Sequence, residues 1–183
     1  LGGRVHVGQR AALIGAGGIG FDVAEYLVHK GESSTLDPKR WMAEWGVDPT
    51  FETRGSLVKP QPEAPAREVW LLQRSAGKPG ARLGKTSGWV HRATLKAKQV
   101  KMLGGVEYLG VNDSGLKIRI DGSEQLLPVD HVVVCAGQEP RRELQAELLA
   151  AGITAHLIGG ADVAAELDAK RAIDQGSRLA AAL

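Results

Sequence analysis

The sequence predicts an α/β fold with a central parallel sheet, an antiparallel β-meander and an appended strand and helix at its C-terminal end. Three observations lead to this prediction. A glycine cluster, "GAGGIG" at 15–20, follows an apolar run and precedes an amphipathic one. Short alternating runs separated by turn residues fill 105–127, and an apolar run, a double glycine and a helical pattern follow from Leu157.

The first element is a buried strand over Val5 to Ile14, followed by a helix. Ile19, Val23 and Leu27 recur at helical spacing, and Gly31 marks the stop. The glycine cluster therefore lies in a turn between a strand and a helix, which is the setting in which G-x-G-x-x-G binds a dinucleotide.

Each glycine of this motif has an expected role. Gly15 allows the tight turn, Gly17 lets the backbone approach a pyrophosphate, and Gly20 permits close packing of the helix on the strand. The free N–H groups at the helix start bind phosphate, so Gly18 and Ile19 join the predicted contacts. The fold class is thus a Rossmann-like dinucleotide-binding domain.

Residues 32–66 are predicted to be an ordered surface insertion, because they are rich in Pro, Gly and Ser around an aromatic cluster of Trp41, Trp45 and Phe51. A fold that binds NAD places an acid about 20 residues after the glycines, at the end of the second strand. Asp37 has that distance, but it stands in "TLDPK" with no strand around it.

The second strand is predicted in "EVWLLQRS", which ends at Gln73 and Arg74. A guanidinium can bind the 2′-phosphate that an acid would repel, so NADPH is favoured over NADH. Residues 67–101 carry nine Lys or Arg against one acid, which adds Lys78 to the predicted phosphate contacts. The alternative is that these charges, Arg74 included, are only solvated.

A glycine-rich loop and a helix from about Trp89 to Val100 follow. The "GKT" in this loop does not fit a phosphate-binding loop of NTPases, since Pro79 occupies the position of the required first glycine. Lys85, Thr86 and His91 are expected to border the cofactor. His91 is interpreted as a residue that packs or supports the residues in contact with the ligand, rather than as a catalyst, because no acid or nucleophile partner is visible in the sequence.

After the meander at 105–127, "HVVVCAGQEP" predicts a strand buried on both faces, with Val132–Val134 at its centre. Ala136 and Gly137 would let a nucleotide lie against the backbone. Cys135 is interpreted as a small buried residue rather than a reactive thiol, because no C-x-x-C motif is present.

The C-terminal part is predicted to contain a short helix over 141–151, a strand from Leu157 and a long helix after the double glycine. Val163, Leu167 and Ile173 would form an apolar side of the long helix. Asp162 is either an N-cap or a ligand for hydroxyl groups of a second nucleotide.

Composition excludes several classes of function. No apolar run approaches the roughly 20 residues of a membrane span. The single cysteine excludes a disulfide framework or a cysteine-ligated cluster within this segment, and it favours a cytoplasmic origin. Nucleic acid binding is disfavoured because no aromatic platform accompanies the basic residues. Neither a metal site nor a catalytic residue is predicted, and Leu1 suggests a piece of a longer chain.

The segments "IGAGGIGFDVAEYL", "LLQR", "LGKTSGWVHR", "VVVCAGQEP" and "LIGGADVAAELDAKRAI" resemble the bacterial NADPH-dependent 2,4-dienoyl-CoA reductases of fatty acid beta-oxidation, which are related to trimethylamine and histamine dehydrogenases. The resemblance implies that 1–153 form the NADPH-binding domain and that 154–183 belong to an FAD-binding domain. FMN, a 4Fe-4S cluster and the rest of the FAD domain would lie in the remainder of the enzyme, as partners of this segment.

The resemblance also implies FAD contacts at Gly160, Asp162 and Val163, although this chain alone should hold neither FAD, FMN nor the cluster. The family role is hydride transfer from NADPH to FAD, with electrons passing on to FMN and the unsaturated acyl-CoA. A nucleotide-binding module without hydride chemistry, as in the amine dehydrogenases, stays open as an alternative. The predicted NADPH contacts are Gly15, Gly17, Gly18, Ile19, Gly20, Arg74, Lys78, Lys85, Thr86, Ala136 and Gly137.

Overall fold

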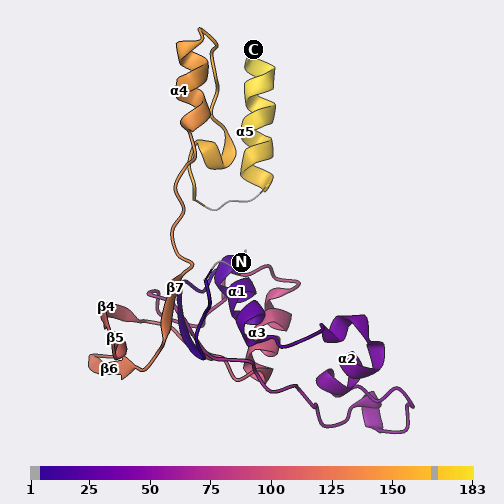
Figure 1. Cartoon of the computed structure of the whole chain (residues 1–183). Coiled ribbons are helices and arrows are strands. Elements are labelled where there is room, and N and C mark those ends of the chain that lie inside the picture. The colour runs from indigo at the N-terminus through magenta and orange to yellow at the C-terminus, as the bar shows by residue number, and fades with distance from the viewer. Residues whose placement is uncertain (1–4, 166–168) are drawn as a thin grey trace. The chain divides into compact units, whose positions relative to one another are not determined.

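The computed structural model describes residues 5–165 and 169–183, which divide into two compact units after Ala136 (Figure 1). The first four residues of the predicted nucleotide-binding domain lie outside the described residues. The first unit contains β1 (Arg10–Ile14), α1 (Gly18–Val28), η1 (Ser34–Leu36), α2 (Pro38–Trp45), η2 (Arg54–Ser56), β2 (Glu68–Leu72), α3 (Gly88–Ala97), β3 (Lys101–Leu103), β4 (Glu107–Asn112), β5 (Gly115–Ile120), β6 (Ser123–Leu127) and β7 (His131–Val134).

The sheet at the centre of the first unit is parallel, with the strand order β3-β2-β1-β7. A separate antiparallel sheet, β4-β5-β6, is the predicted meander. The α/β prediction is therefore confirmed. Strand β1 begins at Arg10 rather than at Val5, because its neighbours begin level with it: Arg10 is paired with Glu68 and Ala11 with His131.

Both faces of the parallel sheet are covered, which gives the first unit three layers. Ala11 and Leu13 pack with side chains of α1 and α3, whereas Ala12 packs with Trp70 and with the inner face of the meander, including Ile118. The alternation follows from the period of two along a strand. Burial of each large apolar side chain contributes about 1.5–3 kcal/mol, so the two core clusters hold the layers together.

Strand β7 is not buried on both faces, and that prediction is wrong. Val132 and Val133 are half-buried, and Val134 is 70% exposed. The physical reason is the strand order: β7 lies at the edge of the sheet, with β1 as its hydrogen-bonded neighbour. An apolar run alone does not distinguish a central strand from an edge strand.

The helix after the glycine-rich loop, α3, ends at Ala97, three residues earlier than predicted. Gln99 has φ of 60°, a left-handed conformation that ends a helix. The next residue, Val100, donates its backbone N–H to the Leu95 carbonyl at 2.9 Å. Helix α3 contacts α1, and both cover the same face of the sheet.

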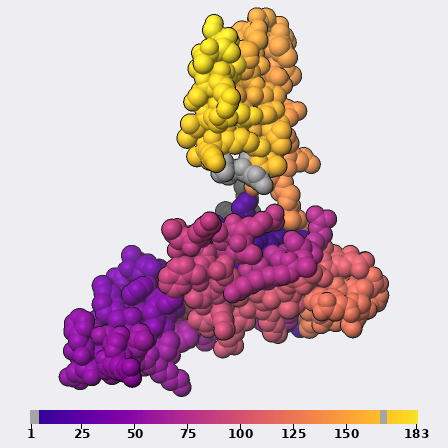
Figure 2. Space-filling view, turned by 180° about the vertical axis from the view of Figure 1, so that it is seen from behind, coloured from indigo at the N-terminus to yellow at the C-terminus, as the bar shows by residue number. Residues whose placement is uncertain are grey.

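The insertion at 32–66 is an ordered lobe of the first unit (Figure 2). Its helix α2 begins at Pro38, and the Asp37 carboxylate caps it by accepting the backbone N–H groups of Lys39 and Arg40 at 3.0 and 3.3 Å. Asp37 is therefore a helix cap, which explains an acid at that position without a ribose contact.

The predicted aromatic cluster of the insertion is only partly correct. Trp41 and Trp45 are neighbours on α2, with ring centroids 6.1 Å apart and planes inclined by 37°. Phe51 is 81% exposed and lies in a turn, with φ of 62°. The turn is fixed by Asp48, whose carboxylate accepts hydrogen bonds from the hydroxyl groups and backbone N–H groups of Thr50 and Thr53.

The second unit contains α4 (Glu143–Ala150), η3 (Gly159–Ala161) and α5 (Ala169–Ala182). The predicted strand from Leu157 is wrong, since 153–158 adopt no regular structure. A strand needs a hydrogen-bonded neighbour, and the described residues of this unit offer no other strand. No helix within the described ranges has the length and apolar character needed to cross a membrane.

Candidate functional site

The glycine turn joins β1 to α1 at the carboxyl edge of the parallel sheet, as the sequence predicts. Gly15 has φ of 114°, and a Cβ atom there would lie 2.8 Å from the carbonyl oxygen of Cys135. A Cβ atom on Gly20 would lie 1.8 Å from the carbonyl oxygen of Gly15 and 3.3 Å from Leu71. Both positions therefore require glycine for the fold itself.

Gly17 differs from these two glycines. Its φ of −86° and ψ of −173° are open to any residue, and a Cβ atom there would have no neighbour within 4 Å. The space in front of Gly17 is thus free for a ligand. Because Gly17 has no side chain with which to cap α1, the N–H groups of the first helical turn, which begins with Gly18 and Ile19, face this space without an intrahelical acceptor.

A cleft of about 260 Å³ lies in front of the turn. The Gly17 and Gly18 backbone lines one part of it, and the loop after β2 lines the other. Gln73 shapes this loop, since its Nε2 donates to the carbonyl oxygens of Ser75 at 3.0 Å and Gly77 at 3.3 Å. The lining residues are Ala16, Gly17, Gly18, Gln73, Ser75, Ala76, Lys78, Gly80, Ala81, Arg82 and Leu83.

Two cations, Lys78 and Arg82, contribute to this lining, and none of the lining residues is acidic. Lys78 was predicted from the sequence. The sequence does not distinguish Arg82 from the other eight Lys and Arg residues of 67–101, because no period or motif marks its position. The positive end of the α1 dipole and these two charges make the cleft suitable for an anionic ligand.

Arg74 is exposed at the end of β2, and it is not one of the residues that line the cleft. Its charge acts on Tyr108 of β4 instead: burial raises the pKa of the Tyr108 phenol, and the Arg74 guanidinium opposes that shift. Lys85 and Thr86 are exposed in the turn before α3 and do not line the cleft either. Their contacts with a nucleotide stay predictions.

The end of β7 lies beside the glycine turn. The Cys135 backbone N–H donates to the Ile14 carbonyl at 2.8 Å, and a Cβ atom on Gly15 would lie 3.0 Å from that of Ala136. Burial raises the pKa of the Cys135 thiol above its ordinary value, so the thiol stays neutral near pH 7. Gly137 has φ of 83° and is the first residue of the second unit.

Comparison with known proteins identifies the family to which this architecture belongs. The profile of the family described as "Pyridine nucleotide-disulphide oxidoreductase" matches residues 3–170. The chain belongs to the pyridine nucleotide-disulphide oxidoreductase family. It is therefore an oxidoreductase domain of a family named for its nucleotide cofactor.

The relatives of this oxidoreductase domain are much longer than the chain. A "Metal reductase" from Desulforamulus reducens is 27% identical over 146 residues, which are 79% of this chain and 20% of that protein. A solved 2-naphthoyl-CoA reductase in complex with 2-naphthoyl-CoA has a TM-score of 0.61 at 20% identity, over 95% of this chain and 21% of that one. Histamine dehydrogenase from Rhizobium sp. 4-9 has a TM-score of 0.60 at 16% identity, over 95% and 23%. The chain spans about a fifth of each.

His91 of the oxidoreductase domain has an acidic neighbour that the sequence does not reveal. Its Nδ1 lies 3.6 Å from an oxygen of Glu25 on α1. The pair joins α1 to α3 at their exposed sides, away from the residues that line the cleft. His91 does not line the cleft, and its contact with a cofactor stays a prediction.

The residues predicted to contact FAD lie in the second unit. Asp162 does not cap a long helix: it follows η3, and its Oδ2 accepts a hydrogen bond from Gln175 Nε2 of α5 at 2.9 Å. The same side chain of Gln175 accepts the Gly159 N–H through Oε1 at 2.6 Å. Gly160 and Val163 flank Asp162, and Leu167 lies outside the described residues. FAD binding by this segment stays a prediction.

Proposed function

We propose that this chain is the NADPH-binding module of a multidomain flavin and iron-sulfur 2,4-dienoyl-CoA reductase. The observation that carries the proposal is the open glycine turn facing a cleft whose charged lining residues are Lys78 and Arg82. Family membership supports a pyridine nucleotide as the ligand. The resemblance of the motifs to dienoyl-CoA reductases supports the substrate class.

The residues present fit a dinucleotide. The pyrophosphate would accept hydrogen bonds from the N–H groups at the start of α1, which stay accessible because Gly17 has no side chain. The adenosine end would extend over the carboxyl end of β2 toward the loop that carries Lys78 and Arg82. A 2′-phosphate adds negative charge at that end, and the cleft offers two cations for it.

The contribution of the chain to the reaction is positioning. NADPH, when bound, supplies the hydride, and the protein supplies orientation and electrostatics. The FAD, the FMN-binding barrel and the 4Fe-4S cluster belong to the other domains of the proposed enzyme, which are its partners. We place hydride acceptance by FAD and onward electron flow to FMN and an unsaturated acyl-CoA in those domains.

Titration calorimetry of the chain with NADPH and NADH tests the proposal. A charge-assisted contact of about 1.5–3 kcal/mol corresponds to a preference for NADPH of roughly tenfold to 150-fold. Arg82→Ala should remove most of this preference, and Arg74→Ala should remove it only if the sequence-based assignment of Arg74 is correct. Arg54→Ala, in the insertion and outside the cleft, is the matched control.

Equal affinities for the two nucleotides in the unmodified chain would contradict the assignment of NADPH. Nucleotide binding without a preference for NADPH would favour the alternative, a non-catalytic nucleotide-binding module of an amine dehydrogenase-like flavoprotein, and absence of any nucleotide binding would contradict both functions.

A further inference from the structure

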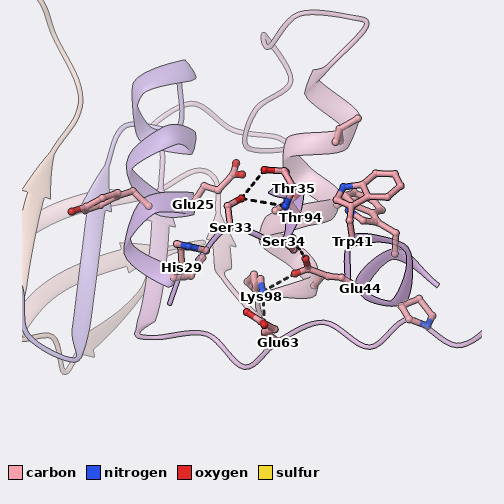
Figure 3. Close-up of a pocket in the computed structure, with 17 residues that line it drawn as sticks. Glu25, His29, Ser33, Ser34, Thr35, Trp41, Glu44, Glu63, Thr94 and Lys98 are labelled. Carbon is pink, nitrogen blue, oxygen red and sulfur yellow. Dashed lines mark hydrogen bonds and ion pairs between the residues drawn. The ribbon is translucent and has the colours of Figure 1, made fainter. Parts of the chain in front are cut away.

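A second and larger cavity lies in the first unit beside the C-terminal end of α1, whereas the glycine turn precedes the N-terminal end of that helix (Figure 3). It has a volume of about 540 Å³ and is bounded by the last turns of α1, by η1 and α2 of the insertion, and by α3. No residue lines both this cavity and the nucleotide cleft. We call it the insertion pocket.

The walls of the insertion pocket are largely apolar. The aromatic pair Trp41 and Trp45 comes from α2, Tyr26 and Val28 come from α1, and Val90 comes from α3. Trp41 keeps 40% of its surface exposed although it has an aromatic neighbour. Cavities of this size with aromatic walls and a few polar groups are the usual form of small-molecule sites.

The floor of the pocket is an ion pair whose charges cancel. Lys98 Nζ lies 2.7 Å from Glu44 Oε1, and the two side chains are only 9% and 15% exposed. Glu44 also accepts the Ser34 hydroxyl at 2.5 Å, and Lys98 also donates to the Glu63 carbonyl oxygen at 3.3 Å. Burial alone would raise the pKa of Glu44, but the hydrogen bonds from Lys98 and Ser34 hold it below its ordinary value. The floor is thus ionised, paired and neutral overall.

The remaining carboxylates on the walls differ in their partners. Glu63 is paired with Arg40, whose Nε donates to it at 2.9 Å. Glu25 has a weaker partner: His91 at 3.6 Å, which is cationic only when protonated. Glu25 is also 48% exposed, so of the three carboxylates it has the weakest protein partner and is the most accessible to a ligand.

Figure 3 shows Glu25 on α1 and Trp41 on α2 at opposite sides of the pocket. A carboxylate on one side of a pocket and an indole ring on the other suit an organic cation, because the carboxylate accepts hydrogen bonds from an ammonium group and the ring packs against an apolar body. We propose that the insertion pocket binds a small organic cation, an ammonium group carried on an apolar or aromatic body. The ammonium would lie near Glu25, and the body would lie against Trp41 and the apolar wall.

Three probes of nearly equal shape test this proposal: 3-phenylpropylamine, 3-phenylpropan-1-ol and 3-phenylpropanoate, which are cationic, neutral and anionic at pH 7. Calorimetric titration of the chain should show one saturable site for the amine. The alcohol should bind about fivefold more weakly, since an ammonium group paired with a half-exposed carboxylate gains about 1 kcal/mol. The carboxylate should bind weakest.

Variants separate the pocket from general surface charge. Glu25→Gln should bring the affinity for the amine down to that of the alcohol. Asp22→Asn, which removes an exposed carboxylate one turn earlier on α1 and outside the pocket, should leave it unchanged. Trp41→Ala should weaken the binding of the amine and of the alcohol by the same factor. Trp89→Ala, at an exposed tryptophan outside the pocket, should leave both affinities unchanged.

The proposal would be overturned by a carboxylate probe that binds as well as the amine, by Glu25→Gln binding the amine like the unmodified chain, or by the lack of saturable binding of all three probes. Circular dichroism of each variant checks the fold, and Trp41→Phe, which keeps a smaller ring, should give an intermediate affinity if the indole contacts the ligand. Since the site shares no residue with the cleft, the amine titration in Gly17→Val reports on this pocket independently of nucleotide binding.

Discussion

Replacement of Gly17 by valine separates the nucleotide-binding role of the glycine turn from its structural role. The backbone of Gly17 has φ of −86° and ψ of −173°, and a Cβ atom there has no neighbour within 4 Å. Valine therefore fits without strain or collision. We expect Gly17→Val to change the free energy of unfolding by no more than about 0.5 kcal/mol, as for a surface substitution.

Nucleotide affinity should respond differently, because the valine side chain occupies the space through which a pyrophosphate reaches the N–H groups of α1. Loss of one hydrogen bond between an N–H group and a charged phosphate costs about 1.5–3 kcal/mol, which weakens binding roughly tenfold to 150-fold. Calorimetric titration with NADPH measures the loss, and urea denaturation followed by circular dichroism measures stability.

Gly110→Val is the matched control. Gly110 lies in β4, and a Cβ atom there also meets nothing within 4 Å, but the residue is not part of the cleft. It should retain both NADPH affinity and stability. Unchanged NADPH affinity in Gly17→Val would refute the reasoning, and so would unfolding of that variant.

Other predictions concern the packing, the buried ion pair and the C-terminal segment. Gly20→Ala should lower the free energy of unfolding in urea by about 1–3 kcal/mol or more, because its Cβ atom meets the Gly15 carbonyl oxygen at 1.8 Å. Lys98→Met should cost about 3–5 kcal/mol in the same assay, since it leaves the Glu44 carboxylate unpaired. The pKa of Glu44 is lowered in the folded state, so its ionised form stabilises the fold above about pH 4.5, and this stability is lost as the pH falls below that value. In urea titrations from pH 6 to pH 3, the free energy of unfolding should therefore fall less steeply for Glu44→Gln than for the unmodified chain. The purified chain should be colourless and should not quench micromolar FAD fluorescence saturably, whereas retention of stoichiometric flavin after dialysis would contradict the prediction that this chain alone holds no FAD.

The elements that local periodicity determines could be predicted from the sequence. The glycine turn, α1, the meander and the helix α4 follow from spacing and from turn residues, and the structure confirms them. The position of a strand in its sheet depends instead on distant residues. Val132–Val134 therefore resemble a central strand although they lie at the edge, and 153–158 resemble a strand although no neighbour pairs with them.

For the candidate site, the backbone positions were more predictable than the side chains. Gly15, Gly17 and Gly20 belong to one local motif, whose geometry is set within six residues. Which basic residue lines the cleft depends on the path of the loop after β2, and Gln73 fixes that path through two backbone carbonyl groups. Arg82 is brought to the cleft by this loop, which has no sequence period that would distinguish it from Arg74.

The pairing of β1 with β7 has a consequence for how the protein folds during synthesis. The backbone N–H of Arg10, at the start of β1, donates a hydrogen bond to Asp130, which lies 120 residues further along the chain. Strand β7 follows Asp130 and is the last strand of its sheet to leave the ribosome. The meander forms from local pairs and can fold earlier, whereas closing a loop of this length is slow. Because the backbone of Cys135 lies against Gly15, the glycine turn gains its last structural neighbour only when β7 docks. A nascent chain whose residue 135 is still inside the ribosome therefore carries every glycine of the motif but lacks the neighbour that completes the turn.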